Sequence, residues 1–240
     1  MTVSLLNKID HHSVSSVQKW ADCPRSWWVN YVLGEQLPSS VAASFGSQYD
    51  ILVSKKLGLQ PKEEPTELVE GVEDAVSGYF SQEHAFRDAS VAQGEVNITP
   101  GQWSVFGEMH DLCVEIAKPV LGFIDLEDPL RGKLVDLKTS SGAGSQPKWG
   151  FQVLIYALAR HYGQAEIHLM TRTKNPAWYR YMVPVEPQAL KWAMTNFTFY
   201  ANQIEDALRS GNGENLARNP DFYCSWCAEQ INCPARSIIY

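Results

Sequence analysis

The sequence lacks long apolar runs and a secretion leader. Hydrophobic residues make up 45% of its 240 residues, but no uninterrupted apolar stretch approaches the roughly 20 residues that a membrane-spanning helix needs. The first ten residues have neither the charged start nor the apolar core of a secretion signal. These absences predict a cytoplasmic protein without a membrane association, and the length suffices for one sizeable hydrophobic core.

An excess of basic residues is also missing. The chain has 20 lysines and arginines against 27 acidic residues, which gives a formal net charge of −7. A protein dominated by phosphate contacts carries the opposite balance, so the composition excludes a tight, non-specific DNA coat protein. It does not exclude catalysis on nucleic acid, because an active site needs acids and a local groove can still be positive. Aromatic residues, at 11%, could hold single strands by base stacking.

Disulfide pairing is not expected either, because the five cysteines are an odd number and no secretory context is present. Three of them, Cys224, Cys227 and Cys233, follow a C-x2-C-x5-C pattern near the C-terminus. Thiolates at this spacing suit a soft metal, since a short loop can wrap them around one ion or cluster. Three ligands leave a fourth to be found, and the spacing alone does not separate zinc from an iron–sulfur cluster.

Acidic residues interrupt two apolar segments in the middle of the chain. Residues 120–126 and 133–138 are predicted strands joined by a short polar turn. Asp125 lies in the first strand and Asp136 in the second, with Lys138 two residues further on. Residues i and i+2 of a strand share a face. Asp136 and Lys138 are therefore predicted to converge, with Asp125 close to their level if the two strands form a hairpin.

This convergence has two interpretations. One is an exposed cluster of salt bridges on an edge hairpin. The other is a site for a divalent cation with a lysine beside it, since buried charges are costly unless they are paired or bind a metal. Mg²⁺ and Mn²⁺ take carboxylate oxygens and water as ligands, and such a cation activates water for attack on a phosphoryl group. The two acids alone do not decide between them.

Three motifs in order give a more specific indication. They are Gly122-Phe-Ile-Asp125, Asp136-Leu-Lys138-Thr, and a glutamine and tyrosine four residues apart at Gln152 and Tyr156. The D-x-K pattern alone is weak, because it arises often by chance. Together, G-x-x-D, D-x-K-T and Q-x-x-x-Y resemble the PD-(D/E)XK nuclease superfamily in its RecB-like branch.

The resemblance implies an α/β fold with a central mixed sheet flanked by helices, as in restriction-endonuclease-like cores. It also implies roles for the motif residues. Asp125 and Asp136 would bind one or two Mg²⁺ or Mn²⁺ ions, with the backbone carbonyl of Leu137 as a further ligand. Lys138 would help to position and activate the attacking water. Gln152 and Tyr156 would contact DNA.

A further ligand is predicted in a helix expected over residues 40–57. RecB-like relatives have a G-[TS]-x-x-H pattern here, whose histidine is a metal ligand. Gly46 and Ser47 match it, whereas Asp50 occupies the histidine position. An aspartate can still bind a hard cation directly or through water, so Asp50 is predicted to be a third acidic ligand. The alternative is a solvated helix aspartate.

The segment from Ser13 to Trp28, S-x-S-x4-W-x2-C-P-R-x-W-W, resembles the N-terminal helical segment of RecB-like nucleases that carry an iron–sulfur cluster. In those proteins a cysteine at the position of Cys23 completes the ligand set. The resemblance to AddB-type nuclease domains and to small CRISPR-associated exonucleases therefore implies a [4Fe–4S] cluster, with zinc as the alternative. The predicted ligands are Cys23, Cys224, Cys227 and Cys233. The cluster would join the first helices to the C-terminal tail.

The resulting prediction is a single nuclease domain over residues 1–240. Its core would span about residues 100–185, and helical, cluster-bearing segments would span residues 13–57 and 186–234. Because helicase motifs are absent, the prediction is a stand-alone, metal-dependent DNA nuclease, with single-strand exonuclease activity in DNA end processing, recombination or CRISPR adaptation. A protein partner in those processes and an oligomer are compatible with it.

Two alternatives are weighed against this prediction. One is a catalytically weak DNA-binding subunit of a recombination or repair complex, which the aspartate at position 50 favours. The other, a zinc-stapled protein without a nucleic-acid role, requires the motif matches to be accidental. Hydrophobic periodicity predicts the remaining elements: helices over residues 67–80, 150–162 and 187–208, and strands over residues 103–106, 111–117, 166–172 and 178–183.

Overall fold

The computed structural model describes residues 5–60, 65–87, 89–104, 113–143, 147–221, 224–225 and 227–235. The chain divides into two compact units, each assembled from separate stretches of sequence. One comprises residues 1–38, 97–121 and 194–240, and the other comprises residues 39–96 and 122–193. They are called the cysteine unit and the sheet unit below.

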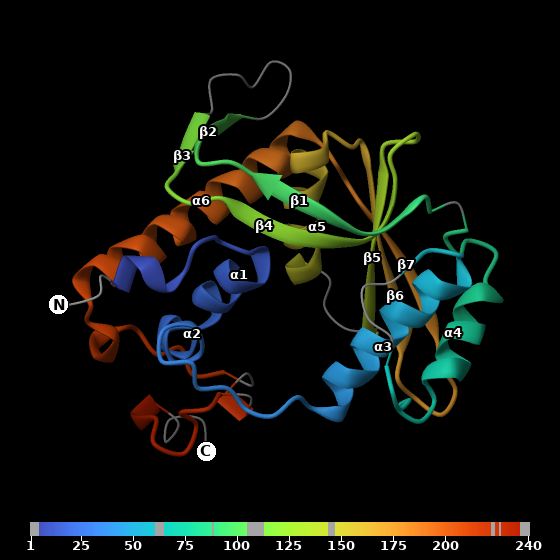
Figure 1. Ribbon diagram of the computed structural model, residues 1–240, viewed down its shortest axis with the longest axis horizontal. Helices are drawn as coiled ribbons and strands as arrows, with labels where there is room; N and C mark the ends of the chain where they lie inside the picture. The colour runs from blue at the N-terminus through green and yellow to red at the C-terminus, as the bar shows by residue number, and fades with distance from the viewer. Residues whose placement is uncertain are drawn as a thin grey trace. The chain divides into compact units, whose positions relative to one another are not determined.

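Most of a five-stranded sheet lies in the sheet unit, with the strand order β1-β4-β5-β6-β7 (Figure 1). β4 and β5 are antiparallel, β5 and β6 are parallel, and β6 and β7 are antiparallel. A parallel pair needs a crossover connection, which helix α5 supplies. The predicted α/β class with a mixed sheet is therefore confirmed. The bounds are β1 Val91–Ile98, β4 Val120–Asp128, β5 Lys133–Ser140, α5 Pro147–Arg160, β6 Gln164–Thr171 and β7 Trp178–Val183.

The hairpin of β4 and β5 is closed by its turn. The Asp128 side chain accepts hydrogen bonds from the backbone N–H groups of Leu130 and Arg131, at 3.0 and 3.3 Å. Gly132 has a φ of +57°, which glycine adopts at little cost. Strand pairing runs from Asp128 opposite Lys133 to Leu126 opposite Val135. Continuing this register by one residue places Asp125 at the level of Asp136, as predicted.

Helices α3 (Val41–Lys56) and α4 (Val72–Phe80) pack on the sheet and against each other. The core beneath them includes Val135 and Leu137 of β5, which are almost completely buried. Because side chains alternate along a strand, Asp136 and Lys138 point to the opposite face of β5. Helix α5 packs against β5, β6 and β7, on the other side of the sheet from α3 and α4 (Figure 1).

The prediction of a helix over residues 67–80 is wrong for residues 67–71. Helix α4 begins only at Val72, after Gly71 with a φ of +83°. The preceding segment is held by Gln48 of α3, whose amide donates to the Glu67 carbonyl and accepts from the Val69 N–H, at 2.8 and 2.7 Å. The side chain of a neighbouring helix thus satisfies backbone groups that a longer α4 would have used.

In the cysteine unit, α1 (Val14–Asp22) and α2 (Pro24–Tyr31) replace one continuous helix. Ser13 caps α1 by accepting from the Ser16 N–H at 3.1 Å. Pro24 is the first residue of α2, a position that tolerates proline because its missing N–H would have no helical partner. The break leaves Cys23 between the two helices in an extended conformation, with a φ of −159°.

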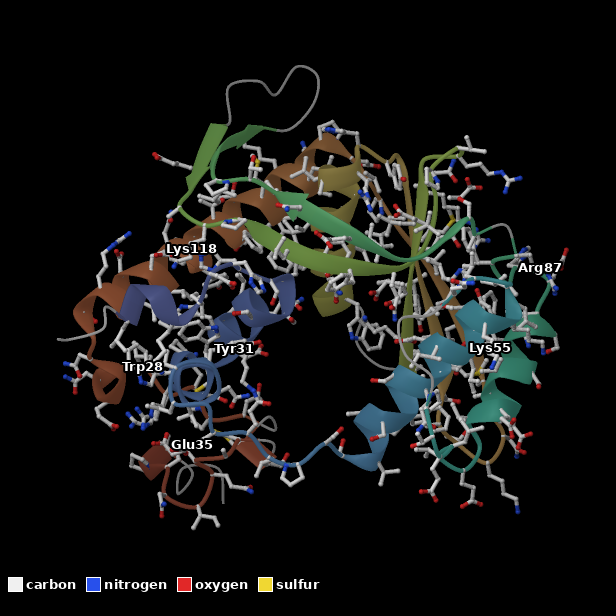
Figure 2. The ribbon with its side chains drawn as sticks, viewed as in Figure 1. Trp28, Tyr31, Glu35, Lys55, Arg87 and Lys118 are labelled. Carbon is white, nitrogen blue, oxygen red and sulfur yellow. The ribbon has the colours of Figure 1, made fainter. Side chains whose placement is uncertain are left out.

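The tryptophans of α2, Trp27 and Trp28, are buried and serve packing. The Trp27 indole donates to the Ser16 hydroxyl at 2.7 Å and stacks on Tyr31 with ring centroids 5.3 Å apart. Trp28 packs against Gly213, where an added Cβ would lie only 2.2 Å from the indole ring. Figure 2 labels Trp28 and Tyr31 on α2.

The remaining elements agree closely with the prediction. β2 (Gly101–Ser104) and β3 (Cys113–Ile116) form an antiparallel pair, while residues 105–112 of the predicted strands lie outside the described residues. Helix α6 spans Pro187–Ser210, and short 3-10 turns occupy Leu5–Lys8 and Gly213–Asn215. No helix in the described part of the chain has the length and apolarity needed to cross a membrane.

Candidate active site

Asp125, Asp136 and Lys138 meet at the β4–β5 hairpin. The Lys138 Nζ lies 2.9 Å from Asp136 Oδ1 and 2.7 Å from Oδ2. Asp125 Oδ2 accepts the backbone N–H of Leu137 at 2.7 Å. This bond fixes the Asp125 carboxylate against the strand that carries the other two groups. The arrangement is the one that the alternation of β5 and the hairpin register predicted.

Burial separates this cluster from an ordinary surface salt bridge. Asp136 is 2% exposed, Asp125 is half-buried, and the Lys138 side chain is 24% exposed. Asp136 Oδ2 is buried without a hydrogen bond, although the Lys138 ammonium is close to it. This oxygen forms an ion pair with the Lys138 ammonium at 2.7 Å, but a buried carboxylate with few hydrogen-bond donors is still costly. It is also chemically suited to ligate a cation.

Asp50 of α3 belongs to the same electrostatic group. Burial, and then the charge of Asp125, raises the pKa of Asp50 well above its ordinary value, and Asp136 adds to the effect. Burial and the charge of Asp136 raise the pKa of Asp125 to about 7. Burial also raises the pKa of Asp136. Three carboxylates therefore share one region, and a divalent cation would relieve their repulsion.

Lys138 is the positive member of the group. Burial alone would lower the pKa of its ammonium, but the carboxylates of Asp136 and Asp125 raise it above the ordinary value. Lys138 is thus held as a cation at neutral pH. In this arrangement it can neutralise charge and donate hydrogen bonds, but it is a poor proton acceptor.

A glycine brings α3 close enough for Asp50 to take part. A Cβ added at Gly46 would lie 3.3 Å from the Thr139 hydroxyl, so α3 approaches β5 tightly at this point. Residues four apart share a helix face, and Asp50 is four residues after Gly46. The matched glycine therefore allows α3, the helix of Asp50, to lie close to Thr139, the residue after Lys138.

Gln152 and Tyr156 lie together on α5, where the Gln152 amide donates to the Tyr156 hydroxyl at 3.2 Å. Tyr156 is 4% exposed. Burial raises the pKa of its hydroxyl, and the charges of Asp136 and Asp125 raise it further. A Cβ at Gly122 would lie 2.6 Å from that hydroxyl. The glycine of the G-x-x-D motif therefore makes room for the tyrosine of the Q-x-x-x-Y motif, a contact that sequence spacing does not reveal.

The four predicted cluster ligands also meet, all within the cysteine unit. Cys23, Cys224, Cys227 and Cys233 are half-buried free thiols, and all four line one cavity of about 110 Å³. Cys224 and Cys227 lie on one tight turn, in which the Cys227 N–H donates to the Cys224 carbonyl at 3.2 Å. A backbone N–H, that of Asp221, donates to the Cys224 sulfur at 3.5 Å.

Neither set of ligands is already arranged around a single ion. Within the ranges that the structure describes, no group of three or more histidine, cysteine, aspartate or glutamate side chains could hold a metal ion as placed. The residues nevertheless fit the implied groups chemically. The acidic site has an excess of negative charge, with three carboxylates beside one lysine, and the four thiols line one cavity. Metal and cluster binding therefore stay predictions.

Two buried ionic networks near the sheet escaped the sequence analysis. Glu127, read as part of a turn, is buried on β4 and accepts from Arg160 and Tyr162 at 2.9 to 3.1 Å. Glu166 of β6 accepts from Arg180 at 2.6 and 2.8 Å. Lys133 and His168 also bind Glu166, at 2.9 and 2.8 Å. Both acids have well-placed donors, so these networks are structural. Apart from His168, which lies two residues from Glu166 on β6, the partners are distant in the sequence, and no local pattern identifies them.

Comparison with known proteins agrees with this geometry. Among solved structures, a proposed exonuclease from Eubacterium rectale is similar over 90% of this chain and 87% of its own, with a TM-score of 0.61 and 16% sequence identity. A phage-related exonuclease from Haemophilus somnus covers 86% of this chain and 99% of its own at 13% identity, but its TM-score of 0.39 supports no argument. No curated protein sequence matches. A family model does match residues 11–234, and the chain therefore belongs to the PD-(D/E)XK nuclease superfamily.

Proposed function

We propose that this protein is a Mg²⁺- or Mn²⁺-dependent DNA nuclease of the RecB-like branch that removes nucleotides from the ends of single strands. The observation that carries the proposal is the acidic site itself. Asp50, Asp125 and Asp136 repel one another beside Lys138, whose ammonium lies 2.7 Å from the buried Oδ2 of Asp136. Buried carboxylates with strongly shifted pKa values cluster at functional sites.

The acidic side chains and one backbone carbonyl would hold the cation. Asp50, Asp125 and Asp136 offer carboxylate oxygens, and the Leu137 carbonyl lies between the two motif residues of β5. A bound divalent cation polarises the phosphoryl oxygen and lowers the pKa of water that it binds. The hydrogen bond from Leu137 N–H to Asp125, at 2.7 Å, orients this carboxylate before any ligand arrives.

Lys138 would act as a fixed positive charge. Its Nζ is held 2.7 to 2.9 Å from the Asp136 carboxylate, and the same carboxylate raises the pKa of the ammonium. A protonated lysine at this place can donate to the attacking water and stabilise the negative charge that develops on the phosphoryl oxygens. Half-buried Gln152 would contact the DNA backbone, while buried Tyr156 would hold the Gln152 amide in place.

Cys23, Cys224, Cys227 and Cys233 would hold a [4Fe–4S] cluster. They line one cavity of about 110 Å³. The resemblance to cluster-carrying RecB-like nucleases favours iron–sulfur over zinc, which four thiolates could also bind. The cluster would stabilise the cysteine unit by tying the α1–α2 junction to the C-terminal segment.

The preference for single-strand ends rests on the resemblance to RecB-like exonucleases and on the exonuclease name of the Eubacterium rectale structure. A recombination or CRISPR-adaptation protein would be the natural partner of such an enzyme. The test uses single strands labelled at either the 5′ or the 3′ end, and a matched duplex, each incubated with Mn²⁺ or with EDTA. We expect mononucleotides or short products from one end of the single strand with Mn²⁺ only. Internal cuts, or equal cutting of the duplex, would contradict the exonuclease proposal.

A second candidate is a DNA-binding subunit with weak catalysis, and the aspartate in place of the histidine ligand is what favours it. The Asp50→His variant separates the two. If Asp50 is a working ligand, histidine keeps or modestly changes cleavage, whereas Asp50→Ala removes it. If the wild-type protein binds single strands without cleaving them and Asp50→His restores cleavage, the second candidate is correct.

A further inference from the structure

Arg25 lines the cysteine cavity, although no motif assigns it a role there. It follows Cys23 by two residues and lines the same cavity as the four thiols. Its exposed fraction is 5%. A buried guanidinium is costly unless each of its N–H groups finds an acceptor.

Two of the three guanidinium nitrogens of Arg25 are satisfied by glutamates. Nε donates to both carboxylate oxygens of Glu229, at 3.0 and 2.9 Å. Nη2 lies 2.5 Å from Glu229 Oε1 and 3.1 Å from Glu214 Oε1. Glu229 follows Cys227 by two residues. The ion pair therefore connects the two segments that carry the thiols, before any metal is bound.

The third nitrogen has no partner. Arg25 Nη1 is buried and makes no hydrogen bond, which leaves two N–H donors unused. Arg218 lines the same cavity and has a buried Nε without a partner. Unpaired buried donors are rare in folded proteins and need an explanation. Here they line the same cavity as the four cysteine sulfurs, together with polar side chains such as Asp22, Asn219 and Gln230.

We propose that Arg25 donates its Nη1 hydrogen bonds to the iron–sulfur cluster and so sets the cluster's reduction potential. The inference rests on the cluster proposed above. Four thiolates give an iron–sulfur cluster a net negative charge, and hydrogen bonds to its sulfurs and nearby positive charge are known determinants of its potential. Hydrogen bonds to the sulfurs and a nearby positive charge both stabilise the reduced cluster, because it is more negative than the oxidised cluster. Arg25 is thus a positioning and tuning residue of the cluster, distinct from the nuclease site.

The test compares Arg25→Lys with Glu229→Gln in the full-length protein, reconstituted anaerobically with iron and sulfide. Arg25→Lys keeps a positive charge but removes the Nη1 donor. Glu229→Gln weakens the ion pair but keeps that donor. Arg209→Lys, on an exposed ion pair of α6 in the same unit, is the matched control. Iron content, the visible spectrum and the midpoint potential are measured for each protein.

We expect Arg25→Lys to lower the midpoint potential by at least the equivalent of a tenfold change in the reduction equilibrium, about 59 mV for one electron. Glu229→Gln and Arg209→Lys should not lower it. If Arg25→Lys binds no cluster while Glu229→Gln does, Arg25 is required for assembly of the cluster and its tuning role is overturned. Equal cluster loss in both variants, or an unchanged potential in Arg25→Lys, would show that Arg25 only forms an ion pair, and would overturn it.

Failure of the cluster and failure of the nuclease are separable outcomes. A wild-type protein that takes up zinc but no iron overturns this inference together with the proposed cluster, whatever its activity on DNA. A protein that holds the cluster but does not cleave DNA overturns only the proposed nuclease function. Asp136→Asn, which lies in the sheet unit, should leave iron content and midpoint potential at their wild-type values.

Discussion

Replacing Asp125 by asparagine should make the metal-free protein more stable above neutral pH. The substitution keeps an oxygen that can accept the Leu137 N–H, now bonded at 2.7 Å. It removes one of the negative charges that Asp50, Asp125 and Asp136 place beside the single ammonium of Lys138. The repulsion that the site stores in the absence of a cation is thereby reduced.

The size of the effect follows from the pKa of Asp125, which burial and Asp136 raise from 3.8 to about 7. Each tenfold change in the proton-binding constant corresponds to about 1.4 kcal/mol, so the charged form destabilises the folded protein by about 4 kcal/mol at most. We expect the charged form to destabilise the folded protein by about half of this maximum, because Asp125 is half-buried and the repulsion is shared with Asp50 and Asp136. For a chain of this size, about 2 kcal/mol raises Tm by roughly 4–8 °C.

The pH window follows from the direction in which folding moves the pKa of Asp125. An acid whose pKa is raised by folding binds its proton more tightly in the folded state, so stability falls as pH rises from about 4 to about 7 and is then constant. The gain from Asp125→Asn should therefore be full at pH 8 and absent near pH 4. Glu95→Gln, an exposed acid on β1, is the control.

The assay is thermal unfolding of wild type, Asp125→Asn and Glu95→Gln in EDTA at both pH values, and then with Mn²⁺ at pH 8. Wild type should gain stability with Mn²⁺, because a ligand that binds only the folded state raises Tm. Asp125→Asn should gain much less. If Asp125→Asn melts at or below the wild-type temperature in EDTA at pH 8, the three carboxylates do not repel one another in the folded protein.

Three further predictions test the surrounding structure. Gly122→Ala should lower the free energy of unfolding in urea by about 1–3 kcal/mol, because its Cβ would lie 2.6 Å from the Tyr156 hydroxyl. Adding Tyr156→Phe should recover part of the loss. If Gly122→Ala costs the same with Tyr156 and with Phe at position 156, the clash with the hydroxyl is not the cause. Glu166→Gln should destabilise the protein by about 2–3 kcal/mol at pH 7. Burial alone would raise the pKa of Glu166, but its hydrogen bonds with His168, Arg180 and Lys133 lower it. That stability is present above the usual pKa of about 4.5 and is lost as pH falls, so an unaltered acid unfolding curve in the variant would contradict the assignment. Cys233→Ser should lower both iron content and Tm while Asp136-dependent chemistry persists at low temperature; a cluster-free protein that melts like the intact one would refute the stabilising role of the cluster.

The strand part of the site could be predicted because its determinants are local. Asp136 and Lys138 converge through the two-residue period of a strand, and the short turn sets the level of Asp125. Asp50 lies far earlier in the chain on a helix, and only the resemblance to a family pattern pointed to it. The structure supplies a physical link through Gly46 of α3, where an added Cβ would lie 3.3 Å from the Thr139 hydroxyl of β5.

What the sequence did not reveal depends on contacts between distant elements. The fit of Tyr156 over Gly122 joins a helix to a strand, and no periodicity encodes it. The start of α4 was misplaced because Gln48 binds the backbone before it, which overrides the local helical pattern. Arg25 looked like part of a cysteine motif, but its pairing with Glu229 requires the two ends of the chain to meet.

The most direct test of the nuclease site is single-turnover cleavage of an end-labelled single strand by wild type and Asp136→Asn, with strand binding measured separately in Ca²⁺. Asparagine preserves the shape of the side chain and the contact with Lys138, but removes the charge that would hold the cation. We predict that Asp136→Asn binds the strand normally and cleaves it at least about a thousandfold more slowly with Mn²⁺, a loss of about 4 kcal/mol of transition-state stabilisation. Cleavage within tenfold of wild type would contradict a catalytic metal site built on Asp125 and Asp136.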